Sequence, residues 1–151
     1  MRVVVVGGVA GGMSAAARLR RRDEEADIIV VERGPYVSFA NCGLPYYVGG
    51  EIADPARLLL HTPQSLKAAL NLDVRINSEA SAINPAAHAV RVTNTETGEA
   101  YTLSYDRLIL TPGAFAARPP IDGLDSARVH TLRTVDDALA LREASGTRAV
   151  V

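Results

Sequence analysis

The sequence predicts an α/β fold with a parallel sheet and a small antiparallel β-meander. Two β-branched runs, at 2–6 and 27–32, flank a glycine-rich loop and an alanine-rich segment. That order is typical of a β-α-β unit of about 30 residues. A further apolar run at 108–110 enters a Thr-Pro-Gly-Ala loop. Alternating polar and apolar stretches before it indicate the meander.

Two helices are expected in the first half of the chain. The loop from Gly7 to Gly12 opens an alanine-rich helix that continues to about Arg22. Thr62 followed by Pro63 is typical of an N-cap and a first helical position, so a second helix is expected to run to about Asn71.

The second half is expected to be mainly β-structure, followed by one helix. The expected strands lie at 74–77, 79–83, 89–93, 100–104 and 108–110, with a turn at 94–98. Thr134 with Asp137 three residues later indicates a capped helix to about Ala144. Residues 148–151 begin an apolar strand at which the chain stops, so we expect a fragment cut at a domain boundary.

Composition excludes several classes of partner. The net charge of -1 gives no excess of positive charge that would bind nucleic acid or an anionic membrane. No apolar run approaches the ~18 residues that span a bilayer. A single cysteine forms no internal disulfide, which favours a reducing, cytoplasmic setting. His61, His88 and His130 have no metal-ligand spacing and are expected at the surface or in turns, so no metal site is expected.

The glycine loop predicts dinucleotide binding. Gly7 and Gly12 occupy the first and third positions of G-x-G-x-x-G, while Val9 stands at the middle position. Glu32 follows Gly12 by 20 residues, at the end of the second strand, where a carboxylate accepts ribose hydroxyls and repels a 2′-phosphate. A turn that only packs tightly is the alternative. The spacing of the strand, the loop, the helix and Glu32 matches a dinucleotide site, which favours binding of FAD or NAD.

Cys42 is the second candidate. An isolated cysteine is usually an inert small hydrophobe. Here Ser38 and Asn41 are polar neighbours, and Pro45 suits the first turn of a helix whose N-terminus would stabilise a thiolate. Tyr47 stands where a C-x-x-x-x-C pair would place its second cysteine, so redox chemistry must use an external thiol or a sulfenate.

The third candidate is the basic face of the first helix, which carries Arg18 and residues 20–22. Arginines near a helix C-terminus are usually solvated. Ser14, Arg18 and Arg21 nevertheless fall at i, i+4 and i+7 on one stripe, which could bind the phosphates of a large anionic thiol. Spacing alone leaves both interpretations open.

Four segments together resemble the single-cysteine pyridine nucleotide-disulfide oxidoreductases, in particular the coenzyme A-disulfide and persulfide reductases. These segments are 6–16, 38–47, 105–114 and 131–133. The resemblance covers essentially the whole chain, and the valine in the glycine loop is typical of this group.

The resemblance implies a Rossmann-like FAD-binding domain of which this chain is the truncated first segment. It implies residues 1–115 as that segment, 116–146 as a connection with a linking helix, and 147–151 as the first strand of an NAD(P)H-binding domain. The residues implied for FAD are Gly7, Gly8, Val9, Ala10, Gly11, Glu32, Arg33, Ala80, Thr111, Pro112, Gly113, Ala114 and Arg133. Those implied for coenzyme A are Ser14, Arg18, Arg21, Ser38 and Asn41.

The implied activity is reduction of coenzyme A disulfide, or a related persulfide, by NADH or NADPH through FAD and Cys42, in a homodimer. NADH oxidases and peroxidases, which would use a Cys42 sulfenate, typically carry a histidine where this chain has Ala10. A lysine that helps bind coenzyme A in some reductases is replaced by Leu70, with Lys67 nearby. A third possibility is a nucleotide-binding module without activity, and the isolated fragment is expected to be inactive.

Overall fold

The computed structural model describes residues 1–144, whose contacts divide the chain into two compact units. The first, which we call the sheet unit, comprises residues 1–38 and 61–113. The second, which we call the cysteine unit, comprises residues 39–60 and those from 114 onward. The strand expected at 148–151 lies outside the described residues, and the domain boundaries expected at 115 and 146 stay predictions.

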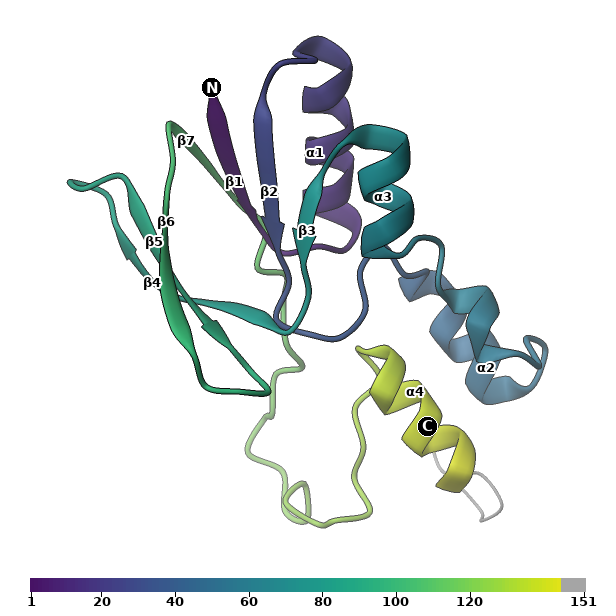
Figure 1. Ribbon diagram of the computed structural model, residues 1–151. Coiled ribbons are helices and arrows are strands. Elements are labelled where there is room, and N and C mark those ends of the chain that lie inside the picture. Colours follow the sequence, from purple (N-terminus) through teal and green to yellow (C-terminus); the bar gives the residue numbers. More distant parts are fainter. Residues whose placement is uncertain (145–151) are drawn as a thin grey trace. The chain divides into compact units, whose positions relative to one another are not determined.

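The sheet unit contains four parallel strands in the order β3-β2-β1-β7 (Figure 1). They are β1 (Arg2–Val6), β2 (Asp27–Val31), β3 (Asp73–Arg75) and β7 (Arg107–Leu110). In the central strand, Val3 is in register with Ile28 on one side and Arg107 on the other. The predicted parallel sheet is confirmed, although β3 begins one residue earlier than expected and is shorter.

The predicted meander is also confirmed. It consists of β4 (Ser78–Asn84), β5 (Ala89–Asn94) and β6 (Ala100–Ser104), paired antiparallel in the order β4-β5-β6. The turn between β5 and β6 contains Gly98 at a φ of 75°, which a residue with a Cβ adopts only at a cost.

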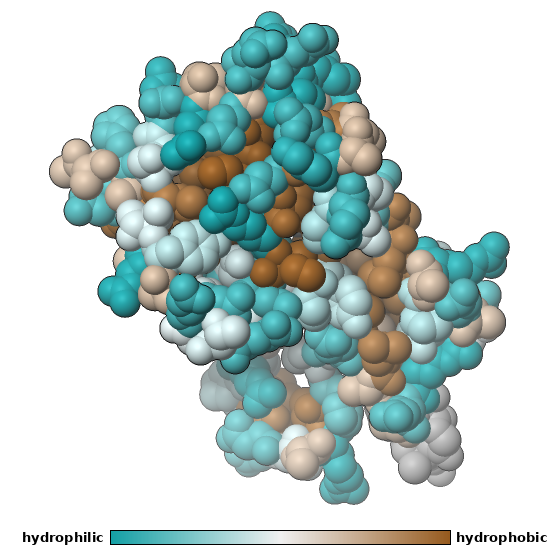
Figure 2. Space-filling view, viewed as in Figure 1, coloured by the Kyte–Doolittle hydropathy of each residue, from teal (hydrophilic) through white to brown (hydrophobic). Residues whose placement is uncertain are grey.

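Helices cover one face of the parallel sheet and the meander covers the other (Figure 1). Val3 and Val5 pack with α1 (Ala10–Arg22) and α3 (Pro63–Leu70), whereas Val4 packs with the meander residues. Successive side chains of a strand point to opposite faces, so a strand covered on both faces needs a continuous apolar run. On the visible face in Figure 2, hydrophobic side chains appear between hydrophilic ones.

The two helices of the sheet unit begin where local chemistry places them. Thr62 and Ser65 form the reciprocal capping box of α3, which confirms the predicted N-cap. Asn71 closes the helix in a left-handed conformation. Helix α1 begins at Ala10, so Gly11 and Gly12 belong to the helix and not to the loop. Glycine is a poor helix former, and its fit here depends on tertiary contacts.

Arg75 links the parallel sheet to the meander. Its guanidinium donates to Asp73 Oδ2 at 2.7 Å and lies 5.3 Å from the centre of the Tyr101 ring. The hydrogen bond to Asp73 raises the pKa of Arg75 above its ordinary value, against the opposing effect of partial burial. A raised pKa keeps the group charged, so its contribution to stability is lost only above the ordinary pKa of arginine.

Arg20 departs from the expected solvated basic face. It is only 9% exposed, whereas Arg18, Arg21 and Arg22 are exposed. Its guanidinium donates to backbone carbonyls near the C-terminal ends of both helices: Leu70, Asn71, Asp23 and Glu24. A cation at two helix C-termini is favourable, so Arg20 ties α1 to α3.

Replacing Arg20 by methionine is therefore expected to lower the free energy of unfolding by about 2–3 kcal/mol, because several partly buried carbonyls lose a charged donor. Arg22→Met is the matched control, since Arg22 is an exposed arginine of the same helix and its loss should change stability by less than about 0.5 kcal/mol. Urea denaturation measures both. Equal stability losses would contradict the assignment.

The cysteine unit contains α2 (Leu44–Gly49) and α4 (Val135–Ala144), which pack together. Its buried side chains include Leu44, Tyr47, Leu58, Val135 and Ala138. The predicted cap of α4 is confirmed: Asp137 N donates to Thr134 Oγ1 at 3.1 Å, and Thr134 N donates to Asp137 Oδ2 at 2.8 Å.

Candidate cofactor and thiol sites

The glycine loop is fixed by the start of the loop that follows β7. Thr111 Oγ1 donates to the carbonyl of Val6 at 2.7 Å and is 3.2 Å from that of Gly7. A Cβ on Gly7, whose φ is 98°, would lie 2.1 Å from Thr111 O, and one on Gly12 would lie 1.7 Å from Gly7 O. No side chain fits at either position, so the strand and the helix approach as closely as backbone allows.

Glu32 does more than the ribose contact expected of it. Its Oε2 accepts from Gly8 N at 2.7 Å, and its Oε1 accepts from Gly34 N at 2.9 Å. Each carboxylate oxygen has a second lone pair, so ribose hydroxyls could still be accepted. The carboxylate therefore shapes the loop, and its contact with a ribose stays a prediction. The spacing rule that singled out Glu32 gave no sign of this second role.

The imperfect glycine pattern has a simple explanation. Val9, at the middle position, has a negative φ of -104°, so its backbone does not lie in the left-handed region that favours glycine. Only Gly7 in this loop has a positive φ. The loop thus needs glycine at the turn and at the close helix contact, and tolerates a side chain at Val9.

The start of α1 has the character of an anion-binding site. Within residues 1–144, no side chain caps this end, and its first turn contains no acidic residue. The first amides of a helix lack internal acceptors and favour negative charge. These amides lie at the carboxyl ends of parallel strands, where open α/β sheets bind their ligands. The residues present fit a dinucleotide pyrophosphate.

The other residues implied for FAD lie in both units. Arg33 is exposed, with Nη1 4.0 Å from Glu79 Oε1, and Ala80 lies on β4, half-buried against the core. In the sheet unit, residues 111–113 follow β7 directly. In the cysteine unit, Arg133 Nε donates to the carbonyl of Ala114 at 3.1 Å. The roles of these residues stay predictions.

Cys42 is a free and exposed thiol. It lies in a 3₁₀ turn at Asn41–Gly43 that runs directly into α2, where Pro45 stands in the first turn as expected. Tyr47 is buried and fills the place of a second cysteine, so within residues 1–144 the thiol has no disulfide partner. An accessible thiol in this setting is available to an external sulfur compound.

The residues implied for coenzyme A are also placed by the structure. Ser14, Arg18 and Arg21 are exposed along α1, as the stripe requires. Ser38 N donates to Gly8 O at 2.9 Å, and Ser38 has a φ of 51°, a conformation that concentrates at functional sites. Asn41 Oδ1 is buried and has no hydrogen-bond partner among residues 1–144, so a bound donor could satisfy it.

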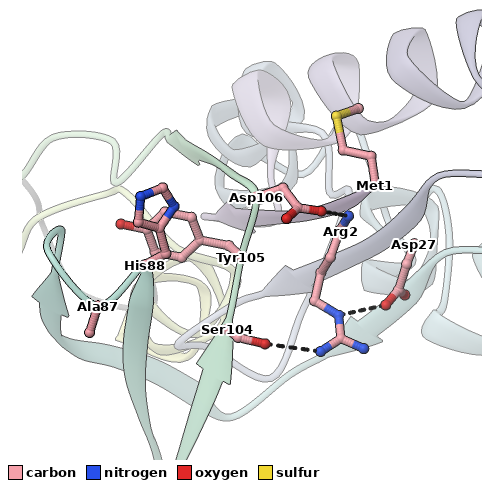
Figure 3. Close-up of a pocket in the computed structure, with 8 residues that line it drawn as sticks. All are labelled: Met1, Arg2, Asp27, Ala87, His88, Ser104, Tyr105 and Asp106. Carbon is pink, nitrogen blue, oxygen red and sulfur yellow. Dashed lines mark hydrogen bonds and ion pairs between the residues drawn. The ribbon is translucent and has the colours of Figure 1, made fainter.

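An open hollow of about 440 Å³ lies at the other end of the parallel strands. Arg2 crosses it, donating to Asp27 Oδ2 at 2.6 Å and to Ser104 Oγ at 3.2 Å, beside the His88 and Tyr105 rings (Figure 3). Ligands of open α/β sheets bind at the carboxyl ends of strands, whereas this hollow borders the amino ends. We regard it as a structural contact between sheet and meander.

The described residues contain no cluster of three or more His, Cys, Asp or Glu able to hold a metal ion. His61, His88 and His130 are exposed, as expected. Among the described helices, none has the length and apolar character needed to cross a membrane.

Comparison with known proteins identifies the family. The pyridine nucleotide-disulphide oxidoreductase model matches residues 1–151. The chain belongs to this family. Its α/β fold is accordingly the Rossmann-type fold that the resemblance implied.

Similar proteins within the family are longer. The chain is 39% identical over 140 residues to a coenzyme A disulfide reductase of Staphylococcus haemolyticus, covering 93% of this chain and 31% of that protein. A crystal structure of reduced Bacillus anthracis CoADR-RHD is 48% identical with a TM-score of 0.91, over 96% of this chain and 26% of that one. The structure of an NAD-dependent persulfide reductase from A. fulgidus is 39% identical with a TM-score of 0.90, and the match covers 97% of this chain and 27% of that one. The chain thus spans about a third of the length of its curated relatives.

Proposed function

We propose that this chain is the first FAD-binding segment of an enzyme that reduces coenzyme A disulfide, or a related persulfide, with NADH or NADPH. The observation that carries the proposal is an exposed free thiol, Cys42, in a family member whose glycine loop is shaped for a dinucleotide. Similarity to a coenzyme A disulfide reductase and to a persulfide reductase supports the substrate class.

The cofactor proposal rests on the sheet unit. The helix amides after Gly7 would hold the pyrophosphate, and Glu32 would hold the adenosine ribose. Gly8 is buried against Glu32, and a Cβ there would lie 2.9 Å from the Glu32 Cβ, so this contact also excludes side chains. Arg33, Ala80, the loop from Thr111 to Ala114, and Arg133 complete the proposed FAD contacts.

The thiol proposal rests on the cysteine unit. The Cys42 thiolate attacks one sulfur of the substrate disulfide, displaces one coenzyme A thiolate, and leaves a mixed disulfide on Cys42. Two electrons and a proton then release the second coenzyme A thiol and restore the Cys42 thiolate. FAD, when bound, supplies the two-electron transfer from NAD(P)H to that disulfide.

The substrate contacts are proposed along α1 and beside Cys42. Arg18 and Arg21 present guanidinium groups suited to phosphates, with Ser14 on the same stripe. Ser38 and Asn41 would hold the part of coenzyme A that carries the thiol. Leu70 stands where some reductases use a lysine, which favours persulfide over coenzyme A disulfide. The nicotinamide site and a homodimer interface are proposed for the remainder of the protein, so the chain alone would be inactive.

Steady-state oxidation of NADH and NADPH by the full-length protein tests this function. The assay compares coenzyme A disulfide, coenzyme A persulfide, and oxygen or peroxide as electron acceptors. Higher kcat/KM for either sulfur substrate supports the proposal, and the ratio of the two decides between them. Turnover with oxygen or peroxide alone would instead assign an oxidase or peroxidase that uses a Cys42 sulfenate.

A further inference from the structure

Arg142, on α4, contacts the segment that carries Cys42. Its Nη1 donates to the carbonyl of Ile52 at 2.8 Å and to the carbonyl of Tyr47, and its guanidinium lies 4.7 Å from the centre of the Tyr47 ring. Tyr47 is only 7% exposed and Arg142 is half-buried, so the ring face in this contact is largely removed from water. Residues from two distant parts of the chain, 47–52 and 142, are thereby joined.

Helix α2 needs such a contact because it is short. Six residues do not form a stable helix in water on their own, and the last carbonyls of any helix lack internal partners. Gly50 N donates to the Tyr47 carbonyl at 3.2 Å, and Arg142 adds a charged donor to the same carbonyl. Its position near the helix C-terminus also suits the helix dipole.

The contact of Arg142 is linked to Cys42 through two side chains, those of Ile52 and the buried Leu58. A Cβ on Gly43 would lie 2.9 Å from Leu58 Cδ2 and 3.5 Å from Ile52 Cδ1, so the residue after the thiol packs against both side chains. Ala40 N donates to Leu58 O at 2.8 Å, and Gly43 N donates to Ala40 O at 2.9 Å. The backbone on each side of Cys42 is therefore held, while Cys42 itself stays exposed.

We propose that Arg142 is a positioning residue for Cys42, which fixes the direction of the thiol by holding the far end of the α2 segment. The proposal deepens the function proposed above and rests on it for its catalytic meaning. Tyr47 occupies the place of a second redox cysteine, so here the position that would close a disulfide instead anchors the segment against α4.

Arg142→Met tests this inference in the full-length protein, with Arg142→Lys as a second variant and Arg107→Met as a matched control. Methionine fills part of the volume but donates no hydrogen bond. Lysine keeps a charged donor but cannot stack as a plane over Tyr47. Arg107 is an exposed arginine of the sheet unit that bonds one backbone carbonyl.

Three readouts separate positioning from a purely structural role. In Arg142→Met, hydrogen exchange of amides 44–52 should accelerate about tenfold, since two charge-assisted bonds are lost. Alkylation of Cys42 by iodoacetamide, followed on its peptide by mass spectrometry, should accelerate about threefold as the segment opens. The thiolate-to-flavin charge-transfer absorbance should fall by at least about half at unchanged FAD content, with Arg142→Lys intermediate and Arg107→Met like wild type.

If hydrogen exchange of amides 44–52 is unchanged in Arg142→Met, Arg142 does not hold the α2 segment. Faster exchange with wild-type alkylation and charge-transfer absorbance would make Arg142 merely structural and would overturn the positioning role. If Arg142→Met does not fold, Arg142→Lys decides by the same criteria. A wild-type protein without the charge-transfer band would contradict the proposed function, while exchange and alkylation would still decide whether Arg142 holds the segment.

Discussion

Cys42→Ser is expected to lower disulfide-dependent NAD(P)H oxidation by the full-length protein by at least about a thousandfold. Serine replaces one atom, but an alcohol does not form the mixed disulfide on which the proposed turnover depends. FAD content and electron transfer from NAD(P)H to an artificial dye should stay near wild type, because neither needs the thiol. Stopped-flow and steady-state absorbance measure each step.

Because Cys42 is exposed, Cys42→Ser tests the chemistry of the thiol without a large effect on stability. The side chain is exposed, so Cys42→Ser should change the free energy of unfolding by less than about 0.5 kcal/mol. Urea denaturation supplies that control. Full turnover with coenzyme A disulfide or persulfide by a folded Cys42→Ser protein would show that the cysteine is not the redox group.

Gly12→Ala is expected to lower the free energy of unfolding by about 3 kcal/mol and to abolish FAD binding. The added Cβ would lie 1.7 Å from the carbonyl oxygen of Gly7, which is backbone and has no side-chain freedom to move aside. Helix α1 would have to shift away from β1, and the amides proposed to hold the pyrophosphate would shift with it.

Gly11→Ala distinguishes damage to the fold from damage to the cofactor site. Its Cβ would lie 3.3 Å from Thr111 Cγ2, which is tight but tolerable, and alanine favours a helix by up to about 1 kcal/mol. Stability should change by about 1 kcal/mol or less, while FAD affinity falls at least about tenfold because a methyl group blocks close approach. Calorimetric titration of apoprotein measures it. Wild-type FAD affinity in both variants would rule out this loop as the cofactor site.

The predictions from sequence succeeded where short-range chemistry decides the structure. Thr62 with Pro63, and Thr134 with Asp137, placed two helix starts correctly because a cap needs only its next few residues. The apolar runs gave the parallel strands, since strands covered on both faces need them. Gly7, Gly12 and Glu32 were singled out by a motif whose spacing follows from the β-α-β geometry, and their role toward a cofactor stays a prediction.

The missed features depend on contacts between distant parts of the chain. Arg20 was grouped with solvated arginines, yet it donates to carbonyls about fifty residues away that no pattern in α1 announces. The same holds for Arg142, whose partners lie at 47 and 52. Gly11 and Gly12 were assigned to the loop as part of the glycine motif, whereas they lie in the first turn of α1, close to Thr111 and Gly7.

Anaerobic titration of the full-length protein with NAD(P)H, followed in the visible spectrum, decides whether Cys42 is the redox group beside FAD. We expect a long-wavelength charge-transfer band between the Cys42 thiolate and FAD, absent in Cys42→Ser and lost again when coenzyme A disulfide or persulfide is added. Flavin reduction without that band in wild type, or with the same band in Cys42→Ser, would show that Cys42 is not this group.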